Sequence, residues 1–274
     1  MSEFTARCRA FHQLHERGCF VIPNPWDIGS ARVLEQLGFK ALATTSAGFA
    51  WSRGHADNRV TVEMTLEHLR AISNAVDVPV NADFGGGFGI ASEAVGHHVE
   101  QAATTGIAGL SIEDSTGDSA EPLYEFRLAV DRIKAARRAI DTSGTGVLLT
   151  ARTEGFVAGR PDIKETIRRL TAFADAGADC LYAPGLRSMD DIKAVVAAVA
   201  PKPVNVLVST DFTTVAELAA AGVRRVSVGG ALARAAWTGF LRASREIAER
   251  GTFASLKDAV PGVDINRLFD EQSS

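Results

Sequence analysis

The feature that most restricts the fold of this chain is an alternation of short apolar runs with longer helical stretches. Eight runs rich in β-branched residues recur, and each is followed by a segment with helical periodicity. The runs are Cys19–Ile22, Ala41–Ser46, Val78–Asp83, Gly109–Asp114, Val147–Thr153, Cys180–Gly185, Pro203–Val208 and Arg225–Gly230. The helical stretches cover residues 28–37, 62–75, 91–105, 123–139, 163–176, 188–198, 213–221 and 231–249. Near-continuous apolar strands predict a parallel sheet covered by helices, and eight β–α units are the number that closes a (β/α)8 TIM-type barrel.

The main alternative is an open, doubly wound α/β sheet, which usually carries a glycine-rich fingerprint after its first strand. Here the first strand is followed by Pro23-Asn24-Pro25-Trp26-Asp27, with no such fingerprint, which favours the barrel. No Ser/Gly-rich linker or charge run divides the chain, so residues 1–274 are predicted to form a single domain. Residues 252–274 are expected to be a short C-terminal helical extension, with helices near Ser255–Ala259 and Asp264–Phe269.

Composition excludes several classes of protein. With 46% hydrophobic residues the chain can bury a large core, which argues against disorder. The net charge of −4, from 29 basic and 33 acidic residues, argues against a nucleic-acid partner. Three cysteines in no metal or redox spacing indicate reduced thiols, and no apolar run reaches the roughly 18 residues of a membrane span. We therefore expect a cytoplasmic protein that binds a small molecule.

Acidic residues stand where two successive apolar strands end. In a barrel of this kind the carboxyl ends of the strands form the active-site face, so Asp83, Glu113 and Asp114 are expected to converge there. Converging carboxylates repel one another unless a cation or a proton lies between them, and hard oxygen ligands suit Mg²⁺. The alternative is that each acid caps the helix that follows its strand.

Arg152 ends a fully apolar strand, where a guanidinium requires an anion. It is predicted either to bind a substrate carboxylate through two parallel hydrogen bonds, or to pair internally with Glu154 or another carboxylate.

A glycine-rich segment follows the third strand, over Phe84–Gly89. It suggests a loop that lets the backbone approach a ligand or that moves as a lid, or else a plain flexible connection. Of the six histidines, only His55 is expected to reach the active-site face. The other five (His12, His15, His68, His97 and His98) fall in helical stretches and are predicted to be solvated.

Taken together, several motifs resemble the isocitrate lyase/phosphoenolpyruvate mutase superfamily over nearly the whole chain. They are Pro23–Asp27, Thr44–Gly48, Gly54–Asp57, Asn81–Asp83, Gly109–Asp114, Ala151–Phe156 and Pro203–Val206. The resemblance implies a (β/α)8 barrel that binds Mg²⁺ with a 2-oxo acid or its enolate, and that cleaves or forms a C–C or P–C bond beside the carbonyl. It also implies a homodimer or homotetramer in which partners exchange the last barrel helix.

The same resemblance assigns roles to individual residues. It implies that Thr45, Ser46 and Ala47 hold the substrate carboxylate, that Arg152 binds the oxo-acid, and that Asn205 lies at the substrate. It further implies that Asp57, Asp83 and Glu113 surround Mg²⁺, mostly through water.

Two departures from the family pattern affect the expected chemistry. The family's Asp-x-Asp-Thr-Gly-Tyr-Gly motif is matched with Asn81-Ala82-Asp83-Phe84 and the glycine run, which places neutral Asn81 at a metal-ligand position and predicts weaker metal binding. The loop over Ser115–Tyr124 lacks the cysteine that serves as general acid in the lyases of the family. We predict that Ser115–Ala120 is a lid, that a helix begins from Glu121 onward, and that water held by Asp118 or His55 supplies the proton.

The predicted function is a Mg²⁺-dependent carbon–carbon lyase. Its substrate is expected to be a small 2-oxo or 2-hydroxy carboxylate, cleaved by a retro-aldol reaction or a decarboxylation through an enolate, because a cation and fixed donors at the enolate oxygen lower the barrier. The alternatives are P–C bond chemistry on a phosphonopyruvate-like substrate, as a mutase or hydrolase, and a non-catalytic barrel that binds oxo-acids.

Overall fold

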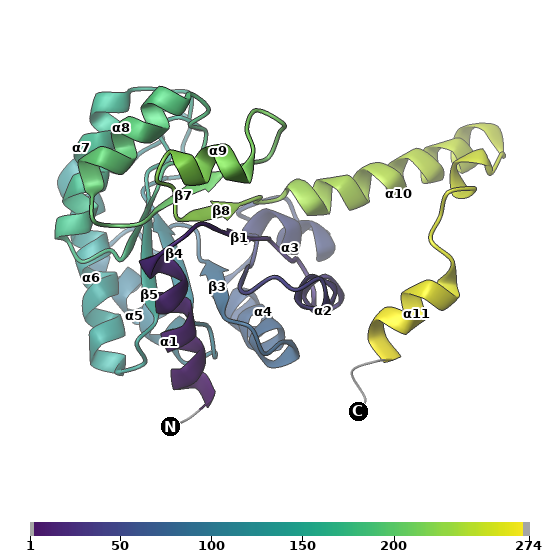
Figure 1. The fold of residues 1–274 in the computed structure, drawn as a ribbon, viewed down its shortest axis with the longest axis horizontal. Helices are drawn as coiled ribbons and strands as arrows, with labels where there is room; N and C mark the ends of the chain where they lie inside the picture. Colours follow the sequence, from purple (N-terminus) through teal and green to yellow (C-terminus); the bar gives the residue numbers. More distant parts are fainter. Residues whose placement is uncertain (1–2, 271–274) are drawn as a thin grey trace.

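The computed structural model describes residues 3–270, in which eight parallel strands form a nearly closed barrel (Figure 1). The strands are β1 (Phe20–Ile22), β2 (Leu42–Ala43), β3 (Val80–Asp83), β4 (Gly109–Glu113), β5 (Leu148–Arg152), β6 (Cys180–Tyr182), β7 (Val204–Leu207) and β8 (Arg225–Ser227). Hydrogen-bonded ladders join them in the order β1-β8-β7-β6-β5-β4-β3-β2. Beyond the ends of β1 and β2, the Ala43 N–H donates to the Pro23 carbonyl at 3.0 Å and the Asn24 amide donates to the Thr44 carbonyl at 3.0 Å. The predicted TIM-type fold and all eight predicted strands are confirmed.

Helices surround the barrel in the predicted alternation. They are α1 (Glu3–Glu16), α2 (Ile28–Gln36), α3 (Ser46–Ser52), α4 (Val62–Ala75), α5 (Ser92–Ala103), α6 (Phe126–Ser143), α7 (Ile163–Asp175), α8 (Met189–Val199), α9 (Val215–Ala220) and α10 (Ala231–Arg250). The tail adds a short 3₁₀ turn, η1 (Ala254–Leu256), and α11 (Gly262–Asp270). The tail was predicted over 252–274, of which 271–274 lie outside the described residues. None of the helices in the described part of the chain has the length and apolar character needed to cross a membrane.

Two helices lie outside the predicted helical ranges, although His12 and His15, which lie on α1, were expected in a helical stretch. Helix α1 buries Cys8 and Phe11 at the start of the barrel strands, where a Cβ on Gly109 would lie only 2.5 Å from the Phe11 ring. Helix α3 begins directly after β2, with Thr45 as its N-cap and Ser46 as its first residue. The prediction that the second strand extends to Ser46 is therefore wrong, because the Thr45 side chain accepts the Gly48 N–H and starts a helix there.

A cluster of buried polar side chains surrounds Arg225 inside the barrel. Arg225 is buried, and its guanidinium donates to Asn205 Oδ1 (2.9 Å) and Thr150 Oγ1 (3.0 Å) and lies 3.3 Å from His15 Nε2. Burial, together with Arg225, lowers the pKa of His15 to about 3, so this histidine is neutral. The prediction that His15 is solvated is wrong, since α1 packs it under the barrel at 8% exposure.

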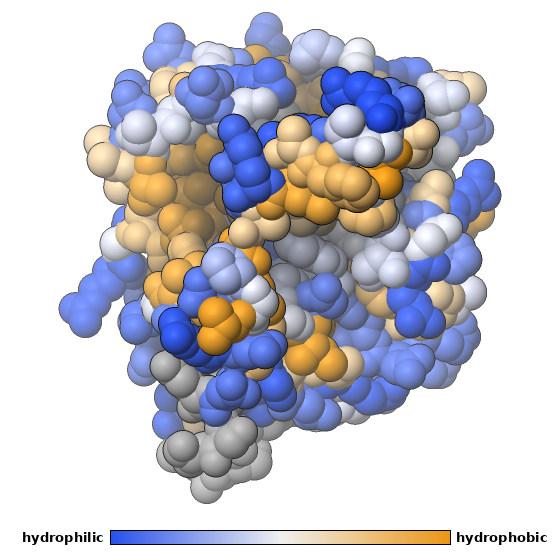
Figure 2. Space-filling model, turned by 90° about the vertical axis from the view of Figure 1, so that its right-hand side faces the viewer, coloured by the Kyte–Doolittle hydropathy of each residue, from blue (hydrophilic) through white to orange (hydrophobic). Residues whose placement is uncertain are grey.

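Helix α10 projects away from the barrel instead of packing against it (Figure 1). Its apolar side chains Trp237, Phe240, Leu241 and Ile247 are 37–59% exposed in the chain as described, and hydrophobic residues gather on this side of the molecule (Figure 2). Helix α11 returns to α2, where the Gln36 side chain donates to the Leu268 carbonyl at 2.5 Å. The eighth barrel helix thus leaves an apolar face without cover from the described residues.

Candidate active site

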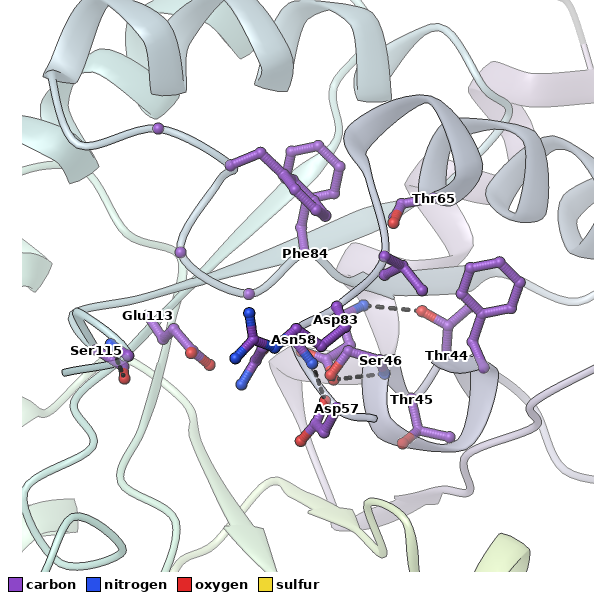
Figure 3. A pocket seen from close by; sticks show the side chains of 18 of the residues that line it. Thr44, Thr45, Ser46, Asp57, Asn58, Thr65, Asp83, Phe84, Glu113 and Ser115 are labelled. Atoms are coloured by element: carbon purple, nitrogen blue, oxygen red, sulfur yellow. Dashed lines mark hydrogen bonds between the residues drawn. The ribbon is translucent and has the colours of Figure 1, made fainter. Parts of the chain in front are cut away.

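A pocket of about 580 Å³ opens at the carboxyl ends of β2, β3 and β4 (Figure 3). Its wall is built from four short segments and a few further side chains. These are Thr44–Ser46, Asp57–Val60, the loop from Asp83 to Ile90, and Glu113 with Ser115–Gly117, together with Phe49, Thr65, His68 and Tyr124. Thr45, Ser46, Asp57, Asp83 and Glu113 therefore meet in one pocket. Asp83 and Glu113 were expected there from their strand-end positions, and Thr45, Ser46 and Asp57 from the family resemblance.

Arg152 lies beside this pocket at the centre of three carboxylates. Its Nη1 contacts Asp83 Oδ1 at 3.0 Å, its Nη2 contacts Glu113 Oε2 at 3.2 Å, and its Nε contacts Glu154 Oε1 at 2.9 Å. The guanidinium also lies 5.0 Å from the centre of the Tyr182 ring. The internal ion pair considered for Arg152 is thus present, and it involves Asp83 and Glu113 as well as the expected Glu154.

Two of the carboxylates around Arg152, those of Glu113 and Glu154, hold protons more tightly than free carboxylates do. Burial raises the pKa of Glu113 to about 8, against the opposing effect of Arg152, and the neighbouring Glu154 and Asp83 raise it further. Burial likewise raises the pKa of Glu154, and burial together with Asp83 raises that of Asp57. Three carboxylates face one guanidinium, an excess of two negative charges when all are ionised. Burial is the main cause of the raised pKa values, and the neighbouring carboxylates add to it.

Asp83 is held from the other side by the start of α3. The Ser46 N–H and hydroxyl both donate to Asp83 Oδ2, at 2.9 and 2.8 Å, and the Asp83 N–H donates to Thr44 Oγ1 at 2.9 Å. Ser46 and Asp83 therefore form one unit, in which the donors expected for a substrate carboxylate currently bind a side-chain carboxylate. Ala47, the third residue expected there, is absent from the pocket wall.

Asp114 belongs to the support of the site and not to its wall. It is 2% exposed, and its carboxylate accepts from the Thr153 hydroxyl (2.8 Å), the Glu154 N–H (2.9 Å) and Arg169 Nη1 (3.1 Å). These bonds fix the segment after β5 and thereby position Glu154 beside Arg152.

The described residues fit a divalent cation in charge and in donor type. When Asp83, Glu113 and Glu154 are all ionised, they exceed the charge of Arg152 by two, which equals the charge of Mg²⁺, and a bound cation would favour that ionised state. Every available donor is a hard oxygen. Within residues 3–270, no three side chains from His, Cys, Asp and Glu are arranged to hold a metal by themselves. Asp83 and Glu113, with Asp57 nearby, could therefore hold Mg²⁺ with water completing its coordination.

Asn81 lies below these acids. It lines a separate inner cavity of about 50 Å³ with Arg225, and it does not reach the main pocket. Its amide donates to the Ala82 carbonyl, and its Oδ1 has no hydrogen-bond partner among the described residues. The Gly-Tyr-Gly end of the family motif can also be matched to Gly87-Phe88-Gly89, which aligns Asp83 with the first acid and Gly85 with the second. The pocket geometry favours this second match.

Three residues expected at the site lie elsewhere. His55 lines a surface pocket with Trp51 and Trp237, because the end of α3 directs it toward α10. Asp118 is exposed, and its carboxylate accepts the Ala120 N–H within its own loop. Asn205 is 2% exposed and is already bonded on both sides, accepting from Arg225 Nε and donating to Ser227 Oγ, each at 2.9 Å. Its bonding favours a structural role over contact with substrate.

The two ends of the loop after β4 are hydrogen-bonded to each other. Ser115 and Leu123 form an antiparallel bridge, and the Thr116 N–H donates to the Pro122 carbonyl at 3.0 Å. Ser115 and Thr116 line the pocket. The prediction that the next helix begins from Glu121 onward is wrong, because these pairings extend the loop and α6 starts at Phe126 with Glu125 as its N-cap.

Sequence reasoning missed His68, which was predicted to be solvated. Its ring stacks on Phe49 (3.9 Å between centroids, 15° between planes), and its Nε2 is buried without a partner among the described residues. Burial lowers its pKa to about 4, so the imidazole in the pocket wall is neutral at pH 7. The available signal was its spacing, since His68 falls three residues after Thr65 and four before Ile72, both on the buried face of α4.

A model of the phosphoenolpyruvate phosphomutase family matches residues 11–248. This chain belongs to the isocitrate lyase/phosphoenolpyruvate mutase superfamily. An uncharacterised protein of Mycobacterium tuberculosis is 32% identical over 96% of this chain and 98% of its own length. An oxaloacetate decarboxylase of Bradyrhizobium diazoefficiens is 30% identical over 66% of this chain and 64% of its own, and a phosphonopyruvate hydrolase of Variovorax sp. is 28% identical over 85% and 83%.

Solved structures agree with this assignment. A protein of Burkholderia cenocepacia J2315, described as a lyase/mutase, superposes on this chain with a TM-score of 0.94. The two are 48% identical, and the match covers 98% of both chains. A phosphonopyruvate hydrolase solved with oxalate and Mg²⁺ gives a TM-score of 0.84 at 26% identity, over 97% of this chain and 95% of its own. The superfamily thus contains enzymes that act on C–C bonds and enzymes that act on P–C bonds.

Proposed function

We propose that this protein is a Mg²⁺-dependent lyase that cleaves a C–C bond of a 2-oxo or 2-hydroxy carboxylate through an enolate. The observation that carries the proposal is the placement of Arg152 among Asp83, Glu113 and Glu154 beside an open pocket at the carboxyl ends of the strands. A guanidinium is the side chain best suited to a carboxylate, and the surplus of acids around it suits a dication.

Different side chains of the pocket would bind the metal, bind the substrate carboxylate and orient the substrate. Asp83 and Glu113 would hold Mg²⁺, with Asp57 reaching it through water; when bound, the ion supplies positive charge at the carbonyl and enolate oxygens of the substrate. Arg152 neutralises the substrate carboxylate, for which it must exchange one of its present carboxylate partners. The hydroxyls of Thr45 and Ser46 lie on the same wall and orient the substrate by hydrogen bonds.

Proton delivery is assigned to water on the loop side of the pocket. His55 and Asp118 lie outside the pocket wall, whereas Ser115, Thr116 and Tyr124 line it. These hydroxyl groups can hold a water molecule and pass a proton through it to the enolate carbon. The loop that carries Ser115 and Thr116 excludes bulk water when it closes over substrate.

The test is turnover of a substrate panel by the purified protein with Mg²⁺ and with EDTA. Oxaloacetate, 2-methylisocitrate and 2,3-dimethylmalate report C–C cleavage, and phosphonopyruvate reports the P–C chemistry for which the similarity to a phosphonopyruvate hydrolase is the support. Release of pyruvate, oxalate or another carboxylate fragment of C–C cleavage only with Mg²⁺ supports the proposal. If phosphonopyruvate is the one substrate turned over, with release of phosphate, the protein cleaves a P–C bond instead. Binding of these acids without turnover would indicate a non-catalytic barrel that binds oxo-acids.

We also propose that the protein is a homodimer or homotetramer in which α10 packs on the barrel of a second copy. The apolar side chains of α10 are exposed in the single chain, with Phe240 at 59% and Trp237 at 37%, and a partner would cover them. Light scattering after size exclusion tests this, with Phe240→Glu expected to shift the protein toward monomer. A monomeric wild-type protein would refute the assembly.

A further inference from the structure

We propose that the loop over residues 84–90, here called the glycine loop, forms a subsite for an apolar substituent of the substrate. The substrate is then a 2-oxo or 2-hydroxy carboxylate with an alkyl or aryl group, not a small unbranched diacid. This inference rests on the proposed function only in that the acidic end of the pocket binds the carboxylate head.

The pocket has two chemically different parts. Figure 3 shows Glu113 and Asp83 with Asp57 in one part, and Phe84 and Thr65 away from Glu113. The glycine loop contributes the apolar side chains of Phe88 and Ile90 to the wall, which also includes Phe49 and Val60. At about 580 Å³ the pocket falls within the roughly 300–1,000 Å³ typical of drug-sized ligands. A four-carbon acid bound at Arg152 would leave the apolar part in contact with water.

The glycine loop is a fixed wall and not the flexible lid or connection considered from its composition. The guanidinium of Arg132, a residue 1% exposed, donates to the carbonyls of Gly86, Gly89 and Ile90, the last at 2.8 Å. His98 Nδ1 lies 2.9 Å from the Gly87 carbonyl, consistent with donation from the ring N–H. Because four carbonyls of the loop have side-chain partners, its backbone is held in one conformation.

Arg132 joins this wall to the other side of the pocket. Its guanidinium lies 4.0 Å from the centre of the Tyr124 ring, and Tyr124 also lines the pocket. No carboxylate of the described residues forms an ion pair with Arg132, so its charge is stabilised by carbonyl dipoles and an aromatic face. The buried Arg132 guanidinium therefore fixes the shape of the glycine loop and joins it to Tyr124 on the other side of the pocket.

The wall presents apolar surface that folding alone does not account for. Phe88 adopts a left-handed backbone conformation, with φ of 57°, which is strongly disfavoured for an aromatic residue. This conformation places the Phe88 ring edge-on to Phe84 at 5.1 Å, yet Phe88 remains 37% exposed. Ile90, two residues later, is 70% exposed. Backbone strain that exposes apolar side chains on a rigid pocket wall points to a ligand that covers them.

The test measures affinity against chain length by calorimetry on the full-length protein with Mg²⁺. The probes are pyruvate, 2-oxobutyrate, 2-oxopentanoate and 2-oxohexanoate, with phenylpyruvate as the aryl member. Burying one methylene tightens binding by about fourfold, so Kd is expected to fall by about that factor per carbon. Ile90→Ser and Phe88→Asn should flatten this series, so that each variant binds 2-oxohexanoate about as weakly as it binds pyruvate; asparagine tolerates the left-handed backbone at position 88. Val215→Ser, at an apolar residue 44% exposed on α9, is the matched control and should keep the series intact.

The outcomes separate the two proposals. Equal affinity for all chain lengths, with pyruvate still bound, would overturn the apolar subsite and leave the proposed function standing. A chain-length series that survives both loop variants would also overturn it. Failure of every 2-oxo acid to bind would refute the carboxylate head site, and with it the proposed function on which the subsite rests.

Discussion

Replacing Arg152 by lysine tests the centre of the site, because it keeps the charge and removes the geometry. The guanidinium uses three different nitrogen atoms for three carboxylates, at 3.0 Å to Asp83, 3.2 Å to Glu113 and 2.9 Å to Glu154. A single ammonium nitrogen cannot span all three. Losing one or two hydrogen bonds between charged groups, each worth about 1.5–3 kcal/mol, predicts a loss of about 1.5–6 kcal/mol in unfolding free energy. Urea denaturation measures this directly.

The same change should reduce turnover, since a point charge replaces a planar fork at the substrate carboxylate. A loss of about 2–4 kcal/mol in transition-state stabilisation corresponds to roughly 30- to 1,000-fold in kcat/KM. The matched control is Arg168→Lys, which removes a two-bond contact to Glu165 (2.7 and 2.9 Å) at a side chain 53% exposed, and should cost less than about 1 kcal/mol. If Arg152→Lys were no more destabilised than this control and kept full turnover, the central role of Arg152 would be wrong.

Three other outcomes are expected. Glu113→Ala should abolish the calorimetric Mg²⁺ signal while the circular dichroism spectrum is retained, and an unchanged Mg²⁺ affinity would remove Glu113 from the metal site. The pKa values of His15 and His68 are lowered to about 3 and 4, so below pH 6.5 the unfolded chain binds protons that the folded chain does not. The free energy of unfolding should therefore decrease as the pH is lowered, by about 2.5 kcal/mol from pH 7 to pH 5.5 for the two histidines together. A His15→Gln/His68→Gln variant should show a flatter pH profile in denaturation. Replacing residues 115–120 by a Gly/Ser linker should raise KM and lower kcat on a confirmed substrate, whereas unchanged kinetics would exclude a lid.

The barrel and the acidic end of the pocket could be read from local sequence pattern. The strands and most of the helices are indicated by their own hydrophobic periodicity, and parallel strands in a barrel end on the same face. For that reason Asp83, Glu113 and Arg152 could be placed together without knowing any long-range contact. The motif around Thr45 and Ser46 followed the same logic, since it comes directly after the second strand.

Residues on helices and long loops could not be placed in this way. His55 and Asp118 were expected at the pocket and lie outside it, because the direction of a loop side chain depends on what packs against the loop. His68 and Arg132 were not expected at the site. His68 lines the pocket from α4, and Arg132 on α6 donates to carbonyls of the glycine loop, contacts that depend on how these helices pack.

The sequence by itself determined the eight β–α units, the face on which chemistry gathers, and the acids and arginine at the strand ends. All of these follow from short-range periodicity and from the common direction of parallel strands. Only the tertiary structure decided that Arg152 pairs with three carboxylates, that Asn81 and Asn205 lie beneath the pocket, and that Arg132 holds the glycine loop as a rigid apolar wall. These features join residues far apart in the chain, and their distances depend on how the helices and strands pack together.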